Sequence, residues 1–204
     1  MNPTWADSRR AFDDAAGWFT RTAASVGERW DAPGLGEWDV RALVGHTSRS
    51  LLTVETYLAR PAATVEVPSA PEYFRAVSAA AAAAGVAQRG RDAGRDLGPD
   101  PASAVAALAA RVLALVEGCG GDELVTTFAG GMRLADYLPT RTFELVVHTA
   151  DLAAALGVAP DVPASAARQA LHLVTELAVA AGAAGPLLLA ATGRPGLAPG
   201  FSVL

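Results

Sequence analysis

Apolar residues recur at three- and four-residue steps along most of this 204-residue chain, and glycine and proline separate the recurring segments. The clearest case is one face of residues 40–58, which consists of Val40, Leu43, Val44, Thr47, Leu51, Val54 and Leu58. This period is that of an amphipathic helix, whereas a half-buried strand alternates every second residue. The pattern therefore restricts the chain to folds in which helices pack side by side.

Six segments carry this helical period, and the short links between them favour an α-helical bundle. They are residues 7–29, 40–60, 69–88, 100–117, 134–156 and 163–183. Asp39 and Asp100 are expected as N-caps, Ser69 and Glu72 as a capping box, and Pro139 as either a kink or the start of a helix.

Three segments lack that period and are not expected to form long helices. The polar run 89–96 is predicted to be a mobile connection, and the tail from 186 to 204 combines a short apolar piece with an extended end. Residues 124–128 are β-prone and Gly130-Gly131 suits a turn, which predicts a short strand or hairpin.

Composition excludes several kinds of partner. The chain has 21 acidic and 16 basic residues, a net charge of -5, which argues against nucleic acid. No window reaches the length and hydropathy of a membrane span, no signal peptide is readable, and a single cysteine, Cys119, forms no internal disulfide. We expect a cytoplasmic monomer or homodimer. All basic residues are arginine, a bias typical of high-GC genomes such as those of actinobacteria.

Four polar residues share one strip of the segment 134–156. At 100° per residue, Arg141, Glu144, His148 and Asp151 fall within about 80° of one another on a helix. Such groups are costly to place beside an apolar face. A glutamate and a histidine four residues apart can reach one metal ion, but the same pair also occurs as an ordinary surface hydrogen bond.

His46 offers a second imidazole to complement the Glu144–His148 pair. It is predicted at the edge of its helix's apolar face, beside Ser50, Thr53 and Tyr57, where a bundle groove would lie. Taken alone, it is an ordinary boundary histidine. Together with Glu144 and His148 it completes two imidazoles and one carboxylate, a ligand set that leaves a fourth position open and for which zinc is the first choice.

Two blocks of sequence resemble one known family. Residues 38–46 (WDVRALVGH) resemble the tryptophan-to-histidine segment of the mycothiol-dependent maleylpyruvate isomerase N-terminal family, and residues 141–152 (RTFELVVHTADL) resemble its second signature. This family belongs to the DinB-like superfamily of metal-binding four-helix bundles. The resemblance covers roughly residues 5–160. It implies that His46, Glu144 and His148 bind a divalent metal, usually zinc.

The resemblance also sets the expected architecture. It implies an all-α, DinB-like four-helix bundle over residues 1–160, with a C-terminal helix and tail over 161–204 packing on the bundle. The acidic residue that the family usually carries would fall near Ala42 and is absent. The chain is expected to be a short form without the family's sterol-carrier-like C-terminal domain, which leaves the substrate open.

The implied activity is that of a metal- and mycothiol-dependent isomerase or S-transferase acting on a small electrophile. Mycothiol would be the co-substrate, bound with the electrophile between the His46 helix and the Glu144–His148 helix. Two alternatives remain: a metal-dependent hydrolase without thiol, and a non-catalytic metal-binding or regulatory module whose fourth ligand could be Cys119. Arg141 is expected either in a structural ion pair or at the substrate or thiol.

Two further acid–base pairings can be considered from the sequence. Asp151 either orients a ligand histidine or stabilises a buried arginine such as Arg141. His172 lies near Glu176, and a surface pair is expected there.

Overall fold

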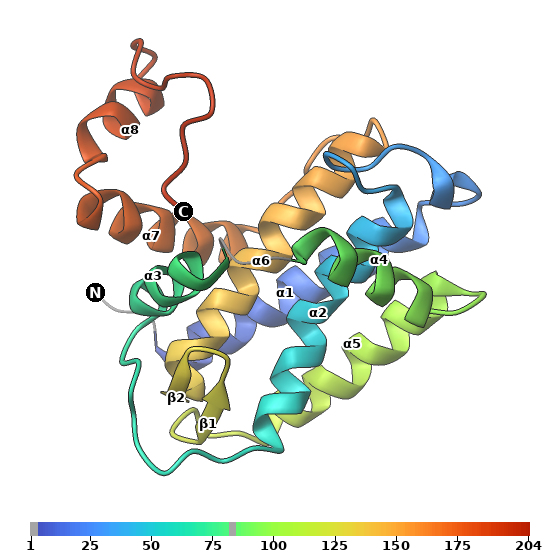
Figure 1. Ribbon diagram of the computed structural model, residues 1–204, viewed down its shortest axis with the longest axis horizontal. Helices are drawn as coiled ribbons and strands as arrows, with labels where there is room; N and C mark the ends of the chain where they lie inside the picture. Colours follow the sequence, from blue (N-terminus) through green and yellow to red (C-terminus); the bar gives the residue numbers. More distant parts are fainter. Residues whose placement is uncertain (1–3, 82–84) are drawn as a thin grey trace.

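The computed structural model describes residues 4–81 and 85–204, and it is mostly helical (Figure 1). Four long helices make the bundle: α1 (Trp5–Ala24), α2 (Val40–Leu58), α5 (Pro101–Glu117) and α6 (Leu134–Ala155). Both α1 and α2 pack against α5 and α6, so the four helices form a ring around one apolar core. The predicted all-α bundle is confirmed.

The helix starts follow the sequence closely. Asp39 caps α2 by accepting a hydrogen bond from the Ala42 amide at 2.7 Å, and Asp100 caps α5 in the same way. The first helix, however, ends at Ala24 and not near residue 29. Ser25 is its C-cap, Gly27 beyond the cap adopts a φ of 62°, and a short 3₁₀ helix follows at Arg29–Asp31.

The expected helix over 69–88 is divided. It begins as α3 (Ala70–Ala81), and its residues 82–84 lie outside the described part of the chain. The Ser69 hydroxyl accepts a hydrogen bond from the Glu72 amide at 3.4 Å. The Glu72 carboxylate forms an ion pair with Arg75 at 3.2 Å, so the second half of the predicted capping box is replaced by an exposed pair.

The mobile connection predicted over 89–96 is wrong, because residues 86–96 form a helix, α4 (Val86–Asp96). This helix packs against α2 through glycines: a Cβ added to Gly45 would lie 2.1 Å from the backbone nitrogen of Gly94. Trp38 adds a hydrogen bond from its Nε1 to the carbonyl of Ala87 at 2.9 Å. Tertiary packing therefore stabilises a helix whose local composition does not favour one.

The predicted hairpin is confirmed, with its turn two residues earlier than expected. Strands β1 (Leu124–Thr127) and β2 (Gly130–Arg133) pair antiparallel, and Phe128 and Ala129 form the turn. Gly131 lies inside β2, where an added Cβ would be 2.1 Å from the carbonyl oxygen of Thr64. Close packing against the chain before α3 therefore explains this glycine better than a turn does.

Two helices follow the bundle. The first, α7 (Ala164–Ala180), packs against α1 and α6, whereas α8 (Ala184–Ala191) packs against α7 and buries none of its residues. Figure 1 shows α8 set apart from the ring of long helices. Within the described residues, no single helix is long and apolar enough to cross a membrane; α4 and α5 pass that test only as a pair, bent by 96°.

Candidate metal centre and its cavity

Three of the residues singled out by sequence lie together between α2 and α6. His46 comes from α2, Glu144 and His148 come from α6, and one donor atom from each lies within 4.8 Å of the other two. The rings of His46 and His148 meet edge to face with their centroids 4.7 Å apart. Ligands of one zinc ion lie about 3–4 Å from each other, so a small side-chain movement would bring all three donors onto one ion.

Hydrogen bonds at both ring nitrogens fix the orientation of His148. Its Nδ1 lies 3.1 Å from Asp151 Oδ2, and its Nε2 lies 3.2 Å from Glu144 Oε2. Burial alone would lower the pKa of His148, but these two carboxylates outweigh it and raise that pKa to about 9. Burial would likewise raise the pKa of Glu144, but its hydrogen bond with His148 and the Arg141 charge lower it.

His46 is held in the opposite protonation state. Burial, together with the nearby His148, lowers the pKa of His46 to about 4. Its Nδ1 is buried without a hydrogen-bond partner among the described residues, and its ring stacks at 4.5 Å on Trp38. A neutral imidazole with an unsatisfied buried nitrogen, an oriented second imidazole and an ionised carboxylate fit the donor set of a divalent metal.

Arg141 is buried, with 9% of its surface exposed, and it borders the same cluster. Its Nε donates to Thr140 Oγ1 at 2.9 Å, and its guanidinium lies over the rings of Tyr73 and Tyr137 at 5.2 and 5.0 Å. Within the described chain it forms no ion pair with a carboxylate, and the Asp151 carboxylate contacts His148 instead. Aromatic faces stabilise such a cation but leave its charge available to an anionic group.

A cavity of about 470 Å³ opens beside the cluster. His46, Arg141 and Glu144 line it, as do Ser50, Thr53 and Tyr57, the neighbours of His46 on α2. Sequence reasoning missed the contributions of α3 and of the hairpin, including Tyr73 and Phe128. Only tertiary packing brings these elements to the cavity. The β-prone run that ends at Phe128 was the one local signal for the hairpin's contribution.

The remaining candidates lie elsewhere. Among the described residues, Cys119 is not part of the His/Glu/His group and is therefore not placed as a fourth ligand. Its Sγ donates to the carbonyl of Leu115, and burial raises its pKa. His172 lies 3.5 Å from Glu176, as expected of a surface pair.

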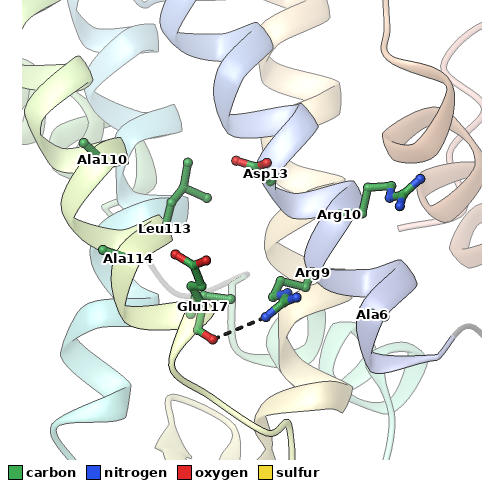
Figure 2. A pocket seen from close by; sticks show the side chains of 9 residues that line it. Ala6, Arg9, Arg10, Asp13, Ala110, Leu113, Ala114 and Glu117 are labelled. Carbon is green, nitrogen blue, oxygen red and sulfur yellow. Dashed lines mark hydrogen bonds between the residues drawn. The ribbon is translucent and has the colours of Figure 1, made fainter.

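A second hollow lies between α1 and α5, and none of the three residues of the His/Glu/His group lines it (Figure 2). Its polar side chains include Arg9, which donates to the carbonyl of Glu117 at 3.3 Å, and Asp13. Alanine side chains form much of the rest of its lining. Over residues 4–81 and 85–204, the metal-capable cluster, which consists of His46, Glu144 and His148, lies beside the cavity of about 470 Å³ and not in this hollow.

A four-helix ring with two imidazoles and one carboxylate converging from neighbouring helices fits the class of DinB-like metal-binding bundles. Residues 6–153 match the family described as the mycothiol maleylpyruvate isomerase N-terminal domain, and the chain belongs to this family. The match spans both sequence blocks that carried the resemblance, which is thereby confirmed. Comparison with curated proteins and with solved structures gave no significant match.

Proposed function

We propose that this protein is a metal-dependent enzyme that uses mycothiol to isomerise a small electrophile or to transfer the thiol onto it. The observation that carries the proposal is that His46 and Glu144 belong both to the metal-capable cluster and to the lining of the cavity. A metal held by them would border the space open to a substrate. Membership of a mycothiol-related family supports the choice of thiol.

We propose Zn²⁺ held by His46, Glu144 and His148, because two imidazoles and one carboxylate with a free fourth position are typical of catalytic zinc. When bound, the ion supplies a positive charge that favours the thiolate form of a thiol. The protein sets the orientation and the protonation state of the two histidine ligands. Asp151 orients the His148 ring through Nδ1, and burial keeps His46 neutral.

The proposed chemistry begins when the mycothiol thiolate adds to an activated double bond. A carbon–sulfur bond forms, and the π electron pair moves onto the substrate's electron-withdrawing group. Rotation and expulsion of the thiolate give the isomer, while protonation of the carbon gives the S-transfer product. We assign Arg141, a cation that lines the cavity, to the negative charge that develops on the substrate.

Metal analysis of purified variants tests the site. After zinc supplementation, we expect about one equivalent of metal in the wild type and a marked loss in His46→Ala, Glu144→Ala and His148→Ala. His172→Ala is the matched control, because His172 also faces a glutamate four residues away but lies outside the cluster. Calorimetry should show saturable mycothiol binding to the wild type and to the control, and its loss in His148→Ala.

Two results would reject the proposal. One is a wild type that holds no metal while the cluster variants bind mycothiol as it does. The other is turnover of a substrate at an unchanged rate without any thiol, which would instead indicate hydrolysis by a metal-activated water.

A further inference from the structure

The cavity beside the cluster has an apolar part that the proposed chemistry does not use. It consists of Phe74 and Val77 from α3, Val86 from α4 and Phe128 from the hairpin tip. Single exposed apolar residues are common on proteins, but these four line one cavity together with polar and charged side chains, so the cavity offers a ligand both an apolar surface and charged groups. The apolar part of the cavity therefore indicates that the ligand has an apolar portion.

Phe128 is the most exposed member, with 71% of its surface accessible, and its backbone is braced. Thr127 Oγ1 donates to the carbonyl of Gly130 at 2.7 Å and accepts from the Ala129 amide at 3.1 Å. Glu66 Oε2 accepts from the Gly131 amide at 2.8 Å, which ties the hairpin to the segment before α3. The turn backbone is thus held beside the cavity, with the exposed Phe128 side chain in its lining.

Phe74, which α3 contributes to the cavity, is held in place by packing. It is buried, with 5% of its surface exposed, and its ring meets that of Phe143 edge to face at 5.3 Å. Arg141, which lines the same cavity, comes from the helix that carries Glu144. Apolar groups on α3 and the hairpin, combined with the cations Arg49, Arg89 and Arg141 that line the same cavity, suit a ligand with one apolar and one anionic end.

We infer that Phe128 is a specificity-determining residue, and that the electrophile carries an apolar group about the size of an aromatic ring. This group packs against Phe128, Phe74 and Val77, while the reactive, electron-withdrawing end lies toward Arg141 and the metal-capable cluster. The inference deepens the proposed function and rests on it for the nature of the reaction. A cavity of about 470 Å³ is within the range of small-molecule sites.

The test compares two probes, trans-cinnamate and crotonate, which are unsaturated carboxylates that differ in carrying a phenyl or a methyl group. We expect the wild type to bind cinnamate about tenfold more tightly, because the phenyl ring removes more apolar surface from water. Phe128→Ala should weaken cinnamate binding about fivefold and leave crotonate binding unchanged, while Phe128→Trp retains the preference. Leu171→Ala is the control, since Leu171 is 64% exposed on α7 and lies outside the cavity.

Binding is measured by calorimetry without thiol, on the protein as purified and again after treatment with EDTA. Equal affinities of the wild type for the two probes, or equal losses of both in Phe128→Ala, would overturn the inference. A phenyl preference that persists in a protein unable to hold metal would support the inference while the proposed function failed. A protein that binds metal and mycothiol but shows no preference for the phenyl group would contradict the inference while the proposed function stood.

Discussion

The contact between α2 and α4 gives the sharpest stability prediction, through Gly45→Ala. The new methyl group would lie 2.1 Å from the Gly94 nitrogen and 2.5 Å from its Cα. Ordinary contacts of this kind are about 3.5–4.0 Å, so the helices would have to separate by more than 1 Å. Backbone atoms offer no alternative rotamer, and the cost should approach the upper end of overpacking penalties, about 3 kcal/mol.

Helix propensity acts in the other direction. Replacing a helical glycine by alanine stabilises a helix by about 1 kcal/mol, which leaves a net loss of about 2 kcal/mol for Gly45→Ala. In a protein of this size that loss corresponds to a fall in Tm of about 4–8 °C. The free energy of unfolding is measured by urea titration followed by tryptophan fluorescence, with Tm from calorimetry as a second readout.

Gly17→Ala is the matched control, because Gly17 lies within α1 and an added Cβ would meet the flexible Arg21 Nη1 at 3.3 Å. It should leave the free energy of unfolding unchanged or raise it by up to about 1 kcal/mol. The two substitutions are chemically identical, so their difference isolates the contact with Gly94. If Gly45→Ala unfolds at the same urea concentration as Gly17→Ala, the steric argument is wrong.

Two predictions concern the metal centre. Asp151→Asn should weaken zinc affinity about 10–100-fold with the fold intact, because the carboxylate no longer orients His148; competition with a chromophoric chelator and far-UV circular dichroism measure the two effects. Zinc affinity of the wild type should rise about tenfold per pH unit from pH 6 to 8, because a metal must displace the proton from His148, whose pKa is about 9. His46, with a pKa of about 4, should release no second proton.

Each of these has a clear contrary result. An Asp151→Asn variant with wild-type zinc affinity would show that Nδ1 needs no carboxylate. A zinc affinity independent of pH, or one that changes a hundredfold per unit, would contradict the protonation states assigned to the two histidines. Calorimetry in two buffers of different ionisation enthalpy counts the released protons directly.

The sequence predicted those parts of the fold that local chemistry determines. Asp39 and Asp100 place helix starts because a capping side chain acts within three residues of itself. The spacing of Glu144 and His148 predicts that both lie on one face of a helix for the same local reason. Their neighbourhood with His46 required knowledge of which helices are adjacent, and only the family resemblance supplied it.

The failure over residues 89–96 has the opposite cause, which is tertiary packing. Residues 89–96 are rich in arginine, aspartate and glycine, and their helix is stabilised by α2, with Gly90 facing the indole of Trp38 and Gly94 facing Arg41 and Ala42. No window of local sequence reports such a contact. The position of Arg141 over two tyrosine rings, Tyr73 of α3 and Tyr137 of α6, was hidden in the same way.

The misassigned helix is also linked to the site. Gly45, whose contact sets the approach of α4, directly precedes His46. The same approach places Ala87 to accept the Trp38 hydrogen bond, and the Trp38 ring stacks on His46. In addition, α4 contributes Val86 to the cavity. Glycines that weaken α4 as an isolated helix are thus the residues that let it pack beside His46, the proposed metal ligand, and a local conflict of this kind is expected where a fold builds a site.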